Sequence, residues 1–524
     1  MKVSQTLVAG LASLLLLVAA TPALAADRYN PEGTKISQDE ILTTVVDGGG
    51  GSTESRLVIQ PDGVSEGGTR GQWLHCYGSG DPTCDYGKAG IDILQWAVLP
   101  NCEVSSSSYC VKSLEVAAQS QEFKQARFLG EAKGGLRLAA DPTVSMIEGG
   151  RPSLYEAADA PHAGGGTNYA VVAVATGHFN QKTKKYEVTD LNTSVIPYVN
   201  ESGVNYKAGW FDKTSKPEDA YRGGGYGSSC AFVEDGNCGS IQDFASGTRF
   251  KLQMTIPKSV GGWFQGRMKD PQLAVDASAK VSNLLTVEAE AVTIPKMAVI
   301  RSMSDYTTKE KTWLQNLGYW GTPNGKATGV RAGEEAVFEY LEFYRKMAKD
   351  TAAGVQSMWN FGTVIGGVGS PCLSDTSKVI GIVTTNSMGF EGKSPAFTNG
   401  YLNYKVTGLH FMPDGTTPVQ GTYDLVMRSD AARCLYGFTN APISATVSVT
   451  GGDSSSVATT VVSEKNGWLK MAAYGFTFSQ KTLTVRMTQA KAPAVKKTIT
   501  CVNGKVTKKV TAVNAKCPAG YKKK

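Results

Sequence analysis

The chain has 524 residues, with 53 Lys and Arg, 46 Asp and Glu, and 8 Trp, 21 Tyr and 17 Phe. This aromatic content excludes a chain that is disordered over most of its length, because such chains contain few aromatic residues. The 59 glycines show no three-residue period, which excludes a collagen-like fibre. The length predicts about three to four domains.

The first 25 residues have the pattern of a secretory signal peptide. Lys2 gives a positive start, residues 7–20 are apolar, and Ala-Leu-Ala at 23–25 is a small-x-small cleavage sequence. An uncleaved membrane anchor is the alternative, but the apolar run is short and ends at Pro22. We therefore expect a secreted chain that begins at Ala26, is extracellular or associated with the cell wall, and has no membrane span after cleavage.

The next segments are rich in predicted strands. Residues 26–150 are expected to form a β-rich domain with two disulfide loops, and residues 151–300 a β-sandwich domain. Apolar and polar residues alternate over 250–256 and 285–290, and this period of two is typical of half-buried antiparallel strands. The fold class is therefore predicted to be mainly β, with several antiparallel β-sandwiches in more than one domain.

One segment has helical periodicity instead. Between 334 and 353, apolar residues recur at spacings of three and four, and Glu334 and Glu335 favour the positive end of a helix. This is the one notable helix that we expect, within a mixed region over 301–400. Packing of the helix against the sheets is the favoured interpretation, and binding of a partner is the alternative.

The last segments return to alternation. Residues 401–488 contain about seven short strand-like runs, which predicts an immunoglobulin-like β-sandwich. Residues 489–524 are expected to be a linker followed by a basic tail stapled by a disulfide. In the tail, Asn503-Gly504 separates two strand-like runs and predicts a hairpin with a type I′ turn.

The ten cysteines suggest disulfides, because an exported chain with an even number usually pairs them. Three neighbouring pairs share the spacing C-x7-C, and the last two cysteines would staple the tail. One further pair is left by elimination alone. A zinc site is the alternative, but the sequence has no C-x2-C. The expected pairs are Cys76 with Cys84, Cys102 with Cys110, Cys230 with Cys238, Cys501 with Cys517 and, by elimination, Cys372 with Cys434.

Positive charge is concentrated in the tail. The whole chain has a net charge of +7, but residues 491–524 hold ten Lys and no acid, and Lys2 lies in the signal peptide. Subtracting these eleven from 53 leaves 42 basic against 46 acidic residues over 26–490, a net charge of −4. A nucleic-acid binder more often carries its basic residues on the folded domain. We expect no nucleic-acid partner, and we predict that the tail binds cell-wall polyanions.

No catalytic motif is complete. Residues 63–67 match G-x-S-x-G, but glycines follow where a nucleophile elbow needs a helix. Glu288 and Glu290 project from one strand face, whereas a glycosidase places two carboxylates across a sugar site. The four histidines are scattered along the sequence. We assign no catalytic residue and no cofactor, and we favour a protein that is not an enzyme.

Two kinds of ligand site remain as alternatives. Trp263 and Trp210 are candidates for stacking on sugar rings, although packing in the core is the favoured interpretation of Trp263. A polar turn offers the oxygen ligands that Ca²⁺ prefers, but its spacing is not that of an EF-hand, so we assign no metal. The residues of this turn are Glu234, Asp235, Asn237 and Asp243.

Several strings resemble segments of uncharacterised secreted cell-surface proteins of high-GC Gram-positive bacteria, the actinobacteria. They are 261–271, 423–438, 466–476 and the tail from Thr498 to Lys524, which is rich in Cys and Lys. The resemblance implies export and a cell-surface setting, and it supplies no catalytic residue.

These observations favour an exported protein of the cell envelope with a structural or adhesive, non-catalytic role. Its expected partners are cell-wall polyanions, with glycans or other surface proteins as further candidates. An extracellular carbohydrate-binding protein is the first alternative. A secreted hydrolase, whose site is assembled from residues distant in the sequence, is the second.

Overall fold

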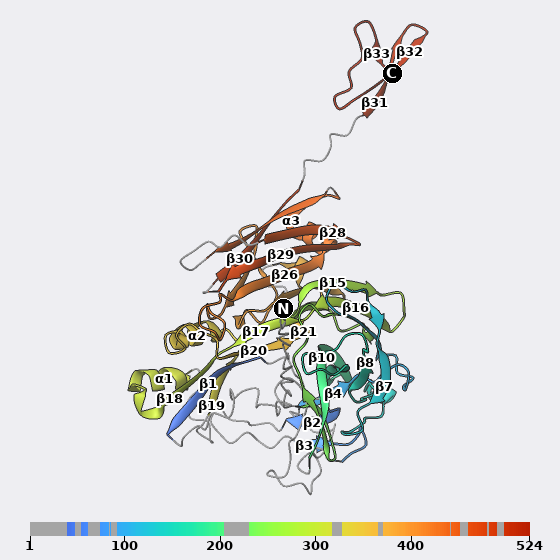
Figure 1. Cartoon of the computed structure of the whole chain (residues 1–524). Helices are drawn as coiled ribbons and strands as arrows, with labels where there is room; N and C mark the ends of the chain where they lie inside the picture. Colours follow the sequence, from blue (N-terminus) through green and yellow to red (C-terminus); the bar gives the residue numbers. More distant parts are fainter. Residues whose placement is uncertain are drawn as a thin grey trace, which may run out of the picture.

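The computed structural model describes residues 39–47, 54–60, 74–82, 84, 92–203, 230–316, 327–364, 370–440, 442–450, 459–478, 481–489 and 497–524. Over these residues the chain is mainly β-strand, in several largely antiparallel sheets with three α-helices (Figure 1). The predicted fold class is therefore confirmed. The expected signal peptide at 1–25 lies outside the described residues.

The largest sheet has 15 strands and crosses most of the described chain. In order of pairing, its main path is β28 (Thr459–Lys465), β29 (Trp468–Thr477), β26 (Gln420–Arg428), β22 (Val379–Thr385), β14 (Gly262–Arg267), β21 (Asn360–Val364), β10 (Lys185–Ser202), β9 (Asn168–Asn180), β4 (Asp92–Val98), β2 (Arg56–Gln60) and β3 (Leu74–Cys76). Four further strands join the sheet off this path. β12 (Asn237–Ile241) pairs with β10 and with β11 (Cys230–Glu234), and β8 (Ser153–Glu156) pairs with β9 and with β7 (Arg127–Glu131).

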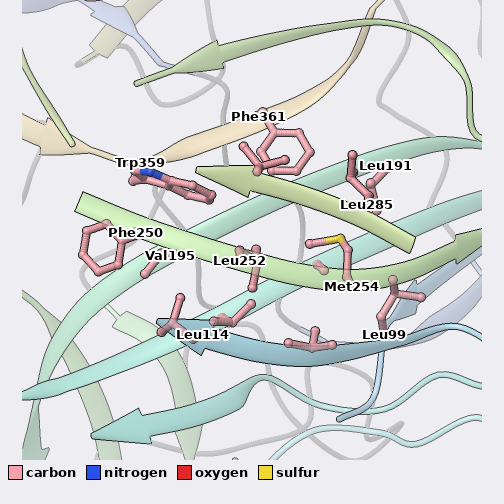
Figure 2. Packing of buried hydrophobic residues seen from close by; sticks show 14 of the residues in the cluster. Leu99, Leu114, Leu191, Val195, Phe250, Leu252, Met254, Leu285, Trp359 and Phe361 are labelled. Atoms are coloured by element: carbon pink, nitrogen blue, oxygen red, sulfur yellow. The ribbon is translucent and has the colours of Figure 1, made fainter. Parts of the chain in front are cut away.

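A five-stranded sheet packs against one face of the large sheet. Phe250, Leu252 and Met254 of its central strand are fully buried, as their alternation predicts. Figure 2 shows these side chains together with Trp359 and Phe361 in the shared core. The strands, in order, are β15 (Lys269–Asp276), β16 (Ser282–Glu290), β13 (Arg249–Pro257), β5 (Cys110–Ala117) and β6 (Lys124–Gln125).

A second five-stranded sheet covers the other face near the C-terminal end of the large sheet. The core between the two layers contains Tyr404 from one and Tyr423 and Leu425 from the other. Leu483, Val485 and Met487, which alternate with polar residues in the sequence, are buried here. The strands are β23 (Gly389–Phe390), β25 (Tyr401–Thr407), β30 (Lys481–Gln489) and β27 (Ile443–Thr450), with β24 (Ala396–Thr398) beside β25.

This sandwich has the strand order of an immunoglobulin domain but a different connectivity. The layer β22-β26-β29-β28 matches the order A-B-E-D, and the layer β27-β30-β25 matches C-F-G, with antiparallel pairs throughout. The difference is that β25 occupies the place of the last strand, G, although it precedes β26 in the sequence. The expected immunoglobulin-like segment, 401–488, therefore also requires β22.

The expected segments do not form separate sheets. The large sheet takes β4 from 26–150, β9 and β10 from 151–300, β22 from 301–400 and β26 from 401–488. The first described strand, β1 (Glu40–Val46), pairs with strands outside the segment 26–150, namely β18 (Ala298–Ser302) and β19 (Ala327–Arg331). Another short pair joins β17 (Val292–Lys296) to β20 (Gly354–Met358). Alternation predicts where a strand lies, but it does not identify the strand with which it pairs.

The helix expected over 334–353 is shorter, and it is not alone. It is α2 (Val337–Arg345), whose apolar face is buried against α1 (Thr308–Asn316) and the β1 sheet. The chain turns where Lys349 and Asp350 adopt positive φ values, so it does not stay helical to 353. Two further helices were not expected from the sequence: α1, which buries only Leu314, and α3 (Ser429–Tyr436), which has eight residues. The described residues also contain three short 3-10 turns: η2 (Pro142–Val144), η3 (Met303–Asp305) and η4 (Pro371–Leu373).

Arg267 at the end of β14 joins the N-terminal strand to the centre of the molecule. Its guanidinium is buried and lies 2.5 Å from the carboxylate of Asp47, which follows β1. It also donates hydrogen bonds to the carbonyl oxygens of Thr385 and Ser387, at 3.0 and 2.7 Å, and lies over the ring of Phe390. One buried cation thus holds together three separate parts of the chain.

The basic tail forms its own three-stranded sheet of β31 (Lys497–Asn503), β32 (Val506–Ala512) and β33 (Lys522–Lys523). The predicted hairpin is present, but its turn is shifted by one residue. Asn503 pairs with Val506, so Gly504 and Lys505 form the turn, and of these only Gly504 has a positive φ. Glycine at the first turn position fits a type II′ turn rather than the expected type I′.

All five expected disulfides are present: Cys76–Cys84, Cys102–Cys110, Cys230–Cys238, Cys372–Cys434 and Cys501–Cys517. The pair that elimination left, Cys372–Cys434, joins the turn η4 to the helix α3. Multiple disulfides of this kind fit a chain that folds in an oxidising compartment.

Removing disulfides is expected to cost stability according to loop length. The bond Cys102–Cys110 spans a sequence separation of 8, and its loss should lower the free energy of unfolding by about 2.5 kcal/mol without abolishing folding. The bond Cys372–Cys434 spans 62, and its loss should cost about 4 kcal/mol. Denaturation of the two Cys→Ser double variants, followed by circular dichroism, would compare them. Equal losses would contradict the dependence on loop length.

Candidate functional site

Trp263 is not available to a sugar ring. Its side chain is fully buried between the two layers of the C-terminal sandwich, and its indole N–H donates to the carbonyl of Leu373 at 3.0 Å. The close approach of Gly261 to the carbonyl of Thr376, where a Cβ would lie 2.2 Å away, fixes the start of this strand. The favoured interpretation of core packing therefore describes this residue. Trp210, the other stacking candidate, lies outside the described residues.

The calcium candidates bind other parts of the protein. Glu234 accepts the backbone N–H of Lys133 at 2.7 Å, and Asp243 accepts both the N–H and the hydroxyl of Ser357, at 2.8 and 2.9 Å. Asp235 lies in the turn between β11 and β12, and the side-chain oxygen Oδ1 of Asn237 accepts a hydrogen bond from the hydroxyl of Ser202. Among the residues that the structure describes, no group of three His, Cys, Asp or Glu side chains is placed to hold a metal ion.

Two histidines have structural partners. His162 is buried, with Nε2 3.1 Å from the carbonyl oxygen of Tyr198, and burial lowers its pKa. His410 Nδ1 lies 2.7 Å from Asp350 Oδ2, and Asp350 Oδ1 accepts a hydrogen bond from Arg345 at 2.6 Å. The contacts of Asp350 with His410 and Arg345 stabilise the turn that follows α2. The G-x-S-x-G match at 63–67 lies outside the part of the chain that the structure describes.

The two glutamates on β16 lie on the outer face of their sheet, as expected. Glu288 accepts a hydrogen bond from Arg249 at 2.9 Å, and Glu290 lies 3.4 Å from Lys269. Both carboxylates are thus engaged by cations on neighbouring strands. They form part of a row of ion pairs on this face, not a pair facing each other across a sugar site.

A charged cluster that the sequence analysis did not assign lies where edge strand β15 meets β26 and β29. The ammonium of Lys470 on β29 contacts Asp270 Oδ1 on β15 directly and lies 3.6 Å from Asp424 Oδ1 on β26. The other oxygen of Asp270, Oδ2, accepts a hydrogen bond from Arg249 at 2.9 Å. The hydroxyl of Tyr474 donates to Asp424 Oδ1 at 2.5 Å.

The local structure explains how these groups meet. Tyr423 and Leu425 face the sandwich core, so Asp424 between them faces β15, where it is completely buried. A register irregularity in β15 and the positive φ of Asp270, 55°, turn its backbone N–H toward Asp424 Oδ2 at 3.2 Å. Bulges of this kind redirect side chains at functional sites.

The pKa values of the two carboxyl groups are shifted in opposite directions from their ordinary values. Burial raises the pKa of Asp424 to about 6, although Lys470 and the hydroxyl of Tyr474 act in the opposite direction. Burial also acts to raise the pKa of Asp270, but the bonds from Lys470 and Arg249 outweigh it and hold that pKa below its ordinary value. One amine therefore contacts two carboxyl groups of unequal acidity, an arrangement that can transfer protons.

The basic tail is the second candidate. All eight lysines over 497–524 are exposed, including Lys508 and Lys509 on β32. Among the described tail residues, 497–524, only Cys501 is buried, so the sheet has almost no apolar core of its own. Its disulfide to Cys517 supplies the constraint that such a small unit needs.

No protein-family model matches the chain, and comparison with curated proteins and with solved structures gives no match. In the described part of the chain, no helix is long and apolar enough to cross a membrane.

Proposed function

We propose that the chain is an exported protein of the cell envelope, with a structural or adhesive role, and that its basic tail retains it at wall polyanions. The observation that carries this proposal is the disulfide-stapled sheet that displays eight lysines to solvent. The resemblance to actinobacterial surface proteins supports the setting, and the five disulfides fit an oxidising one.

Charge distribution supports the tail as the retaining element. Residues 491–524 carry ten lysines and no acid, whereas residues 26–490 have a small net negative charge. A polyanionic wall attracts the tail and weakly repels the body. A sheet of exposed lysines provides this attraction without a shaped pocket, so the proposal requires no recognition of a particular sugar.

Deletion of residues 491–524 is expected to release the protein from purified Gram-positive cell walls. Attraction between exposed charges is screened over about 8 Å at physiological salt. Binding of the full chain should therefore weaken steadily as salt rises, and binding of the truncated chain should be weak at every salt concentration. Sedimentation of the protein with the walls measures both.

A matched variant separates charge from structure. Lys505, Lys508, Lys509 and Lys522 are exposed, so their replacement by glutamine leaves the sheet and its disulfide in place while removing four positive charges. This variant should bind walls more weakly than the native chain, and walls stripped of phosphate polymers should bind neither. If the truncated chain binds as well as the full chain, or if salt has no effect, retention by the tail is wrong.

A further inference from the structure

The Lys470–Asp270 contact has the components of a reaction as well as of an ion pair. The amine nitrogen touches a carboxyl group, only 12 % of the Lys470 side chain is exposed, and the fully buried Asp424 lies beside both. The three residues come from three strands, so the fold holds them together before any bond forms. Fixed contact between two reacting groups removes the entropic cost of bringing them together.

We propose that Lys470 Nζ and Asp270 Cγ form an intramolecular amide crosslink, and that Asp424 transfers the protons that this reaction requires. The crosslink goes beyond the proposed envelope function and does not depend on it. It joins edge strand β15 of one sheet to β29 of another, between residues 200 apart in the sequence.

The reaction balances without any further reactant. The ammonium and the carboxylate together lose one water: Nζ bonds to Cγ of Asp270, and the bond between Cγ and Oδ1 breaks. Asp424 first accepts a proton from Nζ, which frees the lone pair for attack, and then delivers it to Oδ1. A second proton follows the same route, so Oδ1 leaves as water and Nζ keeps one hydrogen. Asp424 ends as the carboxylate with which it began.

The neighbouring residues support each step. Arg249 donates to Oδ2, the oxygen that becomes the amide carbonyl, and its charge stabilises negative charge that develops there during attack. The hydroxyl of Tyr474 and the backbone N–H of Asp270 hold the two oxygens of Asp424. Asp270 keeps 41 % of its side chain exposed, which gives the released water a route to solvent.

Peptide mapping of the reduced, secreted full-length protein tests the proposal directly. Trypsin should fail to cleave after Lys470, and the fragment Asp270–Lys280 should be joined to the fragment that contains Lys470, with a combined mass one water below their sum. Separate fragments with no branched peptide would overturn the proposal. The Lys251–Glu115 pair, at 2.9 Å on the open face of the same sheet, is an internal control that should remain uncrosslinked.

Two variants identify the roles. Asp424→Asn keeps the shape of the side chain but removes proton transfer, and it should abolish the branched peptide while Lys470 and Asp270 remain in place. Lys470→Arg keeps a cation and should also abolish it. Circular dichroism shows whether each variant is folded, and the native protein alone decides whether the bond exists. A branched peptide that persists in Asp424→Asn would refute the role of Asp424.

Discussion

Replacing Arg267 by methionine is expected to lower the free energy of unfolding by about 3–5 kcal/mol, because it leaves a nearly buried carboxylate without its cation. Only 9 % of the Asp47 side chain is exposed. The same change removes the donor to the carbonyl oxygens of Thr385 and Ser387. The loss therefore combines an unpaired charge with two lost hydrogen bonds.

Guanidinium denaturation followed by circular dichroism measures this loss. The double variant Arg267→Met/Asp47→Leu should recover a substantial part of it, because removing both members of a buried pair avoids an isolated charge. The exposed pair Arg127–Glu156 provides the control, and Arg127→Met should cost under about 1 kcal/mol. Similar losses for Arg267→Met and Arg127→Met would show that the buried pair does not join these parts of the chain.

Replacing Trp263 by alanine is expected to cost about 3–5 kcal/mol, because it leaves a large cavity in the core of the C-terminal sandwich. Its side chain is fully buried, and the carbonyl of Leu373 would also lose the indole donor. Trp263→Phe fills part of the cavity and should cost less than Trp263→Ala. Binding to a glycan array should be the same for the native chain and both variants that remain folded.

Guanidinium denaturation again measures the loss, with circular dichroism as the signal because Trp263 contributes to fluorescence. A loss below about 1 kcal/mol for Trp263→Ala would contradict burial of this side chain, since exposed sites tolerate such changes. A selective loss of glycan binding in folded variants would instead restore the sugar-stacking interpretation.

Strands could be located from the sequence, but their partners could not. The alternation over 250–256 correctly identified the buried residues of β13, since Phe250, Leu252, Met254 and Ile256 are all fully buried. The same strand pairs with β5, placing Thr255 opposite Cys110, 145 residues earlier. Periodicity indicates which face of a strand is buried, but it gives no information about pairing with a strand that is distant in the sequence. For this reason the sequence did not indicate that strands from the expected segments pair in one sheet.

The disulfides and the tail were predictable because their signals are local. Spacing alone identified pairs such as Cys102–Cys110, and the hairpin at Gly504 was missed only by one residue of register. The charged cluster had one signal in the sequence, an aspartate in the apolar run of 423–427. Buried carboxylates are rare without a partner. The partners Asp270 and Lys470 lie far away in the chain, and only the packing of three strands brings them together.

The pairing of β1 with β18 has a consequence for the order in which the chain acquires its structure. The hydroxyl of Ser302 reaches the backbone carbonyl of Asp39 across 263 residues. This strand, the first that the structure describes, must therefore wait until the roughly 250 residues between Val46 and Ala298 have been synthesised. Topologies dominated by such distant contacts fold slowly, because the entropy of closing long loops opposes the first native contacts. During this delay the unpaired edge of β1 and the side chains of Ile41 and Leu42 remain open to other chains. Protection from aggregation is therefore a requirement of synthesis for this molecule, independent of its final stability.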